Sequence, residues 1–132
     1  MIGLDTNVLV RYLVHDDPEQ TTLASKAIET RCTPAEPCFI SQIVLCELVW
    51  VLEQSYAQSR EQVALVLDKL LKTSCLDIEE LPLVWQALQD YHAVGVDFAD
   101  AIIAQKHTER GCETTLTFDK KAARLAAFTR LQ

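Results

Sequence analysis

The sequence predicts an α/β fold, a three-layer α/β/α arrangement in which a short, mainly parallel sheet is flanked by helices. Short β-rich runs alternate along the chain with longer segments of helical spacing, as is typical of parallel strands joined by crossover helices. Of the 132 residues, 49% are hydrophobic, and no segment is repeated or of low complexity. This length suits one unit with a buried core, so we expect residues 1–132 to form a single domain.

Capping residues mark where several helices begin. Asp17, Pro18 and Gln20 together predict a helix start, and Ser59 with Gln62 forms a second capping pattern. The elements expected in order are a strand at 2–4, helices at 8–14 and 18–31, a strand at 38–40, helices at 42–56 and 60–71, a strand at 76–78, helices at 82–93 and 98–110, a strand at 114–117 and a short helix from 120.

Features of targeting and redox chemistry predict a cytoplasmic protein with no membrane partner. No apolar stretch reaches the roughly 20 residues that span a bilayer, and the chain opens without a basic head or a small-residue cleavage site. The five cysteines are scattered and contain no C-x-x-C pair, so we interpret them as reduced thiols. They are Cys32, Cys38, Cys46, Cys75 and Cys112.

Charge is unevenly distributed along the chain, although the formal net charge is −7. Residues 101–132 contain six Lys/Arg and three Asp/Glu, which leaves six Lys/Arg and sixteen Asp/Glu in residues 1–100. A basic C-terminal quarter can hold phosphates while an acidic body holds a metal or a basic partner, and an ordinary solvated surface explains the same numbers. The candidate phosphate contacts are Lys120, Lys121 and Arg124.

Glu47 is the one charged residue in the apolar helical segment 43–52. Because this segment is apolar all round, we expect it to be buried, with Trp50 in the core together with Trp85 and Phe98. An unpaired buried carboxylate costs at least several kcal/mol. Glu47 is therefore either a metal ligand in a cleft, or a member of an ion pair or of the exposed rim of its helix.

Three aspartates stand where predicted elements meet. Asp5 and Asp119 each follow a β-rich run and precede a helix, and ligands bind beyond the C-terminal ends of parallel strands. Helix capping explains each of them singly. Asp97 and Asp100 open a further helix, and we interpret Asp100 as a ligand and Asp97 as a cap or supporting residue.

Clustered carboxylates repel one another unless a cation lies between them. Oxygen-only ligands suit the hard cations Mg²⁺ and Mn²⁺. Mg²⁺ usually takes only one or two protein carboxylates. A site of four acids therefore predicts either two metal ions or acids that orient water.

Four motifs in order resemble the PIN domain, and within it the VapC-type toxins of bacterial toxin–antitoxin pairs. They are the opening Ile2 to Val10 with its Asp5-Thr6-Asn7 triplet, Ser41 followed by Glu47, Asp97 to Ala104, and Leu116 to Asp119 with its T-x-D pattern. The resemblance implies a three-layer fold and Mg²⁺- or Mn²⁺-dependent cleavage of RNA. It also implies a homodimer and an antitoxin partner whose C-terminal segment blocks the site.

The mechanism expected from this resemblance assigns a role to each acid. Asp5 and Asp100 hold a metal ion that activates water for attack on phosphorus, and Glu47 and Asp119 complete the ligands or orient the water. Hydrogen bonds to the ligands then fix their geometry, and the candidates for these are Asn7 and Thr117.

Two alternatives belong to other functional classes. A phosphohydrolase of the haloacid-dehalogenase type would use Asp5 as nucleophile, but Asn7 replaces its second acid and no later lysine with paired acids is found. A non-catalytic module that only binds an antitoxin would lack one of the motif acids, and none is missing.

Overall fold

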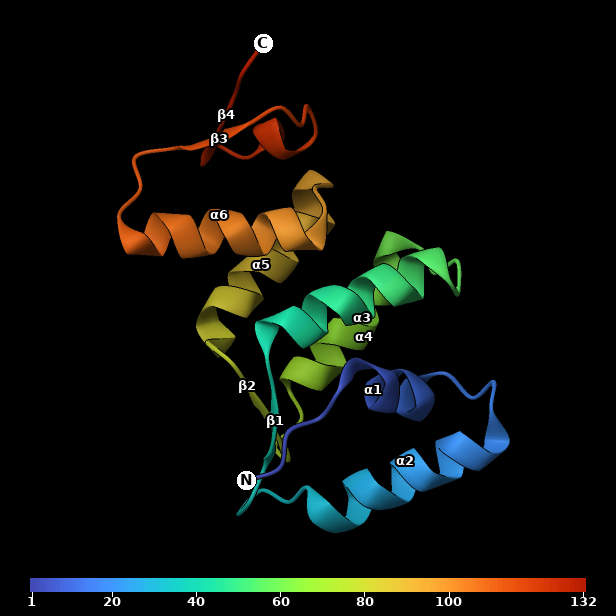
Figure 1. The fold of residues 1–132 in the computed structure, drawn as a ribbon. Coiled ribbons are helices and arrows are strands. Elements are labelled where there is room, and N and C mark those ends of the chain that lie inside the picture. Colours follow the sequence, from blue (N-terminus) through green and yellow to red (C-terminus); the bar gives the residue numbers. More distant parts are fainter.

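The computed structural model describes all 132 residues. Six α-helices, one 3₁₀ helix and four three-residue strands follow one another along the chain (Figure 1). They are α1 (Thr6–Leu13), α2 (Pro18–Arg31), β1 (Cys38–Ile40), α3 (Gln42–Gln54), α4 (Arg60–Leu71), β2 (Leu76–Ile78), α5 (Leu81–Val94), α6 (Phe98–Arg110), β3 (Thr115–Thr117), η1 (Ala122–Arg124) and β4 (Phe128–Arg130). The predicted α/β class, with short parallel strands and flanking helices, is confirmed.

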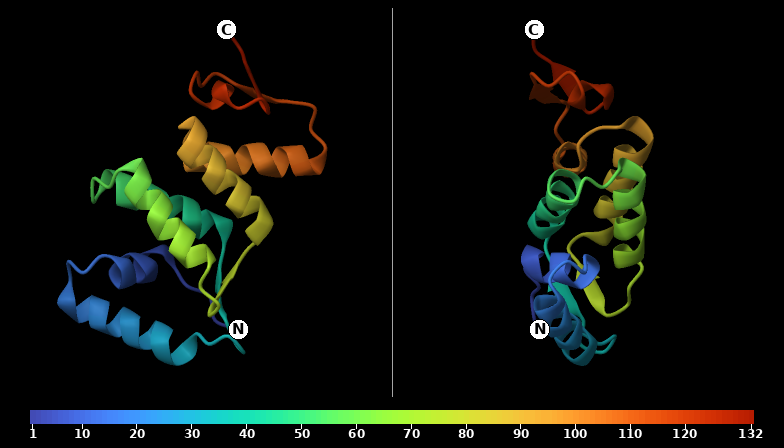
Figure 2. Two further views of the ribbon diagram at one scale, coloured as in Figure 1. Left: turned by 180° about the vertical axis from the view of Figure 1, so that it is seen from behind. Right: turned by 90° about the vertical axis from the view of Figure 1, so that its right-hand side faces the viewer.

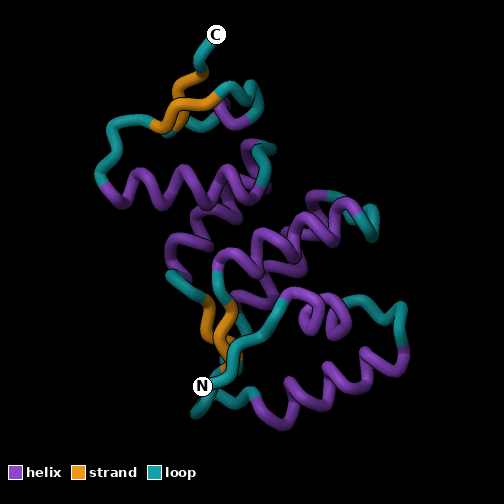
Figure 3. Tube along the Cα trace, viewed as in Figure 1, coloured by secondary structure: helices purple, strands orange, loops and turns teal.

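The strands form two separate parallel pairs. β1 pairs with β2, and the N-terminal segment 2–4 runs parallel to β1 through a bridge between Gly3 and Phe39. β3 pairs only with β4. Figure 3 shows the two groups of strands at opposite ends of the molecule, and Figure 2 shows the same separation from two further directions. The sequence predicted one sheet and did not predict β4.

Local capping chemistry explains where the helices begin. The Asp17 carboxylate accepts from the Gln20 amide, and Ser59 and Gln62 form a reciprocal capping box. The first helix begins at Thr6, two residues earlier than expected, because Asp5 Oδ1 accepts from the Thr6 amide at 2.7 Å.

No helix is both long and apolar enough to cross a membrane.

An aromatic and cationic contact fixes α5 and α6 on α4. Tyr91 is fully buried and meets Phe98 edge to face, with ring centroids 6.0 Å apart. Arg60 stacks on the Tyr91 ring at 4.3 Å and donates to the carbonyl oxygens of Tyr91 and Val96 at 2.9 and 2.7 Å. The Tyr91 hydroxyl donates to Glu53 of α3 at 2.6 Å. The orientation of α5 and α6 is therefore set by packing and by hydrogen bonds together.

Glu79 and Glu80 join β2 to α5 in a second fixed junction. The backbone nitrogen of Gln42 donates to Glu79 Oε1 at 2.9 Å, and its buried side-chain Nε2 donates to Glu80 Oε2 at 3.0 Å. Glu80 adopts a positive φ of 49° and pairs with Lys106 of α6 at 3.0 Å. The hydrogen bond from Lys106 lowers the pKa of the Glu80 carboxyl. This junction ties α3, α5 and α6 to one another.

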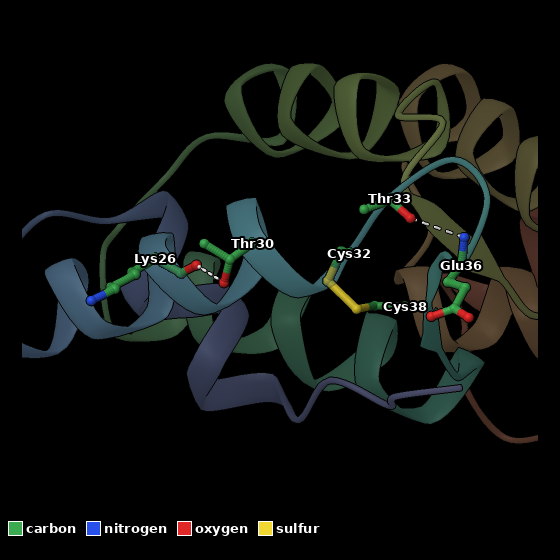
Figure 4. Close-up of a disulfide and its surroundings, with 6 residues drawn as sticks. All are labelled: Lys26, Thr30, Cys32, Thr33, Glu36 and Cys38. Atoms are coloured by element: carbon green, nitrogen blue, oxygen red, sulfur yellow. Dashed lines mark hydrogen bonds between the residues drawn. A yellow bond between two sulfur atoms is a disulfide. The ribbon is translucent and has the colours of Figure 1, made fainter.

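Cys32 and Cys38 form a disulfide, which corrects the interpretation of all five cysteines as reduced thiols. The bond joins the end of α2 to the start of β1 across the loop 33–37, in which Thr33 Oγ1 accepts from the Glu36 amide (Figure 4). The pair was missed because a spacing of six residues matches no familiar cysteine motif. Cysteine usage therefore no longer supports a cytoplasmic location.

Helix α3 is less buried than its apolar sequence predicted. Leu45, Leu48 and Leu52 are fully buried, but Ile43 and Trp50 are 74% and 62% exposed. Glu47 lies on the same exposed face. The predicted burial of Trp50 and of the Glu47 face is wrong because no element of this chain covers that side of α3.

Candidate active site

Three aspartates gather at the start of α6 and the end of β3. One carboxylate oxygen from each of Asp97, Asp100 and Asp119 lies within 4.8 Å of the other two. Asp97 and Asp100 open α6, and Asp119 follows β3. We call these three residues the acid triad. They are close enough to share one cation.

The backbone around Asp119 holds its side chain in place. The Asp119 amide donates to Thr117 Oγ1 at 3.0 Å, and its Oδ1 accepts from the amides of Lys121 and Ala122 at 2.7 and 3.3 Å. Asp119 thus caps the turn before η1, as the capping interpretation predicted, while its carboxylate also faces the other two acids.

Burial and like charge act together on Asp100. Burial raises the pKa of the Asp100 carboxyl, the charges of Asp97 and Asp119 raise it further, and Lys121 opposes this shift. Asp97 makes no side-chain cap for α6 and instead accepts from Lys121 Nζ at 3.1 Å. A single lysine therefore neutralises only part of the charge, and a divalent cation would stabilise the ionised triad.

Asp5 and Glu47 form a separate group, the acid pair, which is connected through Thr6. The Thr6 amide donates to Asp5 Oδ1 and its hydroxyl donates to Glu47 Oε1, both at 2.7 Å. The two acids line a pocket of about 410 Å³ together with Asn7 and Arg11. Both carboxylates are exposed at its surface.

The structure does not bring all four expected acids together within one chain. Asp100 and Asp119 lie in the acid triad, which also includes Asp97, whereas Asp5 and Glu47 lie outside it. The reason is the separation of the strands: Asp5 follows the segment 2–4, Asp119 follows β3, and these two segments do not pair.

The other predicted site residues lie near one or the other of the two groups of acids. Thr117 supports Asp119, whereas Asn7 is exposed and only lines the pocket of the acid pair. Lys120 is exposed, Lys121 is paired with Asp97, and a guanidinium nitrogen of Arg124 lies close to Gly95.

Thr6 was not singled out from the sequence although it connects the acid pair. It is the one buried polar residue of α1. The Asp5-Thr6-Asn7 triplet could have indicated Thr6, but a threonine beside an aspartate at a helix start is also typical of an ordinary helix cap.

Comparison with known proteins decides the family. Residues 2–128 match the PIN domain family. The chain belongs to the PIN-domain family. It is also 25% identical over 122 residues to the VapC ribonuclease of Aquifex aeolicus (strain VF5), a match that covers 92% of this chain and 90% of that protein. Membership in the PIN-domain family replaces the dehalogenase-type alternative.

The donor set of this PIN domain fits a hard divalent cation. The acid triad offers carboxylate oxygens only, which is the donor type that hard cations prefer. No histidine or cysteine belongs to the triad, so softer metals such as zinc are a poorer match.

Proposed function

We propose that this PIN-domain protein is a metal-dependent endoribonuclease that acts as the toxin of a toxin–antitoxin pair. The observation that carries the proposal is the acid triad, with oxygens of three carboxylates within 4.8 Å of one another. The similarity to a protein named VapC ribonuclease supports RNA as the substrate. We further propose that residues 1–132 form a single nuclease domain.

Mg²⁺ or Mn²⁺ is the cation that the oxygen ligands favour. Asp100 and Asp119 would hold it, and Asp5 and Glu47 would supply the remaining acids. When bound, the ion neutralises charge on phosphate oxygens and lowers the pKa of water. Asp97 keeps Lys121 beside the site, and Thr117 fixes the turn that carries Asp119.

Charge distribution supports the two proposed partners. Lys120 and Arg124 follow Asp119 closely in the chain and are exposed, so they can contact the RNA backbone next to the acid triad. Residues 1–100 contain sixteen acidic and six basic residues. That surface suits a basic segment of an antitoxin. We also propose that the protein is a homodimer.

The test is cleavage of a labelled, structured RNA pool by protein free of antitoxin, with Mg²⁺, Mn²⁺ or a chelator. We expect cleavage with metal, none with chelator, and none by an Asp5→Asn variant. The variant keeps the carbonyl oxygen that caps Thr6, so its fold should be retained. Equal cleavage by the parent and the variant would contradict the assignment of Asp5.

A further inference from the structure

Four strand edges of this chain have no partner: those of the segment 2–4 and β2 in one sheet, and those of β3 and β4 in the other. Two of these edges lead into candidate site acids, because the segment 2–4 precedes Asp5 and β3 precedes Asp119. The segment 2–4 bonds to Phe39 of β1 on one side: Phe39 N donates to Ile2 O at 2.7 Å, and Leu4 N donates to Phe39 O at 2.9 Å. β3 pairs with β4 on one side only. Exposed edges of this kind present free backbone groups to another strand. Each edge therefore has room for one further strand.

Large apolar side chains are exposed at β3 and on the face of α3 that carries Glu47. On β3 and just after it, Leu116 and Phe118 are 61% and 77% exposed. On α3, Ile43 and Trp50 flank Glu47 at helical spacing, so they share its exposed face. Large apolar groups gathered in this way mark an interaction surface.

Charge favours contact between the two ends of the molecule. Residues 115–132, which we call the C-terminal unit, contain four Lys/Arg and one Asp/Glu. Residues 1–78, which include the segment 2–4, contain six Lys/Arg and eleven Asp/Glu. Opposite charges of this kind steer two such surfaces together.

Within one chain, the C-terminal unit is fastened away from the segment 2–4. Ala122 and Phe128 of the unit are buried, and His107 of α6 hydrogen-bonds to Thr115 at 2.8 Å. Helix α6 is in turn held by the Lys106–Glu80 pair and by the contacts of Arg60. To bring Asp119 to Asp5 of the same chain, some of these contacts must break, whereas a second copy can reach Asp5 with all of them intact.

We propose that β3 of one copy pairs with the segment 2–4 of a second copy, so that each nuclease site combines Asp5 and Glu47 of one copy with Asp100 and Asp119 of the other. Two such sites form in a symmetric dimer, because each copy contributes its segment 2–4 to one site and its β3 to the other. The composite site rests on the proposed nuclease function, but the strand pairing does not.

Cross-linking tests the pairing without reference to activity. Gly3→Cys and Leu116→Cys are combined in a chain whose free cysteines Cys46, Cys75 and Cys112 are changed to serine. A side chain at Gly3 meets only Phe39 O at 3.9 Å, an ordinary contact, so the fold tolerates it. A short bismaleimide should convert the double variant into a covalent dimer on a denaturing gel.

Each single-cysteine variant is the matched control and should stay largely monomeric. Circular dichroism confirms that all variants are folded. A covalent link within one chain, visible as a monomer of altered mobility, or the absence of any link in the folded double variant would overturn the proposal.

Subunit complementation tests the composite site. Asp5→Asn and Asp119→Asn variants, each inactive alone, are refolded together. Random pairing in a two-fold dimer makes half of the dimers mixed, each with one intact site of two, so we expect about one quarter of the parent activity. No recovery from this pair, with an active parent, would overturn the composite site.

A mixture of Asp100→Asn and Asp119→Asn is the control. Both changes lie in the acid triad, so every site in that mixture contains one of them, and no activity should return. If the parent itself is inactive with metal, the proposed nuclease function fails, and the cross-link still decides the pairing.

Discussion

The two groups of acids differ in what surrounds them. In the body, residues 1–78, Asp5 and Glu47 each accept a 2.7 Å hydrogen bond from Thr6. The acid triad lies at the other end of the molecule, where Asp100 is partly buried between Asp97 and Asp119, and Lys121 is the one positive charge that opposes its raised pKa.

This difference separates acids that are held by a neutral donor from acids that repel one another. A carboxylate that has a neutral donor stabilises the fold without help, whereas three carboxylates within 4.8 Å of one another favour protonation or a cation. The body is also closed by the Cys32–Cys38 disulfide, and the C-terminal unit contains no disulfide. The body is thus stabilised internally, and the triad should respond most to metal.

The largest expected effect is on catalysis, within the triad itself. Asp100→Asn removes a proposed ligand and should lower metal-dependent RNA cleavage by more than about 100-fold, beyond the usual cost of losing a supporting residue. Asp97→Asn should lower it by less than about 10-fold, since Asp97 mainly positions Lys121. Single-turnover cleavage rates at saturating Mg²⁺ measure both, and equal losses would remove the distinction between ligand and supporting residue.

The second effect is on stability and is confined to the body. A Cys32→Ala/Cys38→Ala variant should lose about 2 kcal/mol of unfolding free energy, as expected for a short covalent loop. Urea denaturation measures the loss. Dithiothreitol should lower the midpoint of the parent towards that of the variant and leave the variant unchanged. A variant as stable as the parent would show that the disulfide does not fasten the body.

The third effect is on melting temperature without metal, and it has opposite signs in the acid pair and in the acid triad. Glu47→Ala leaves the buried Thr6 hydroxyl without its acceptor and should cost about 1 kcal/mol, or about 4 °C in melting temperature. Glu47→Gln retains an acceptor oxygen and serves as the control. Asp100→Asn should instead raise the melting temperature, because it removes a carboxylate whose pKa is raised by burial and by its neighbours.

The pH dependence of the parent follows from the same shift. A carboxyl whose pKa is higher in the folded state than in the unfolded state destabilises the fold fully above the raised value, and the penalty disappears below the ordinary value of 3.8. Chelated parent protein should therefore gain stability, relative to Asp100→Asn, as the pH falls through this window. A constant difference between the two melting temperatures across the window would contradict the electrostatic origin of the effect.

The sequence predicted the helices better than the arrangement of the sheet. Helix starts depend on neighbours in the chain, so Asp17 and the Ser59–Gln62 box could be read directly. Strand pairing depends on distant segments, and nothing in the run 114–117 indicates that it pairs with 128–130 alone. The same limit applies to the site: the acids could be identified, but not which of them meet.

Burial of α3 was predicted wrongly for a related reason. An apolar helix is expected to be buried, but its sequence does not say which molecule covers it. Ile43 and Trp50 remain exposed in a single chain, which is consistent with a face that a second copy or another partner covers. The disulfide was missed because a spacing of six residues carries no specific signal.

The smallest effect is on the salt dependence of RNA binding, and it should differ between the adjacent residues Lys120 and Lys121. Lys120 makes no ion pair, whereas Lys121 Nζ lies 3.1 Å from Asp97 Oδ1 and is partly neutralised. Lys120→Ala should therefore remove one phosphate contact and lower the slope of log affinity against log salt by about 0.7–0.9, and Lys121→Ala should change it less. Lys26→Ala on α2, at the opposite end of the molecule, is the control. A larger change from Lys121 would mean that bound RNA displaces Asp97 from the lysine, which would make that ion pair part of substrate binding rather than a fixed support of the triad.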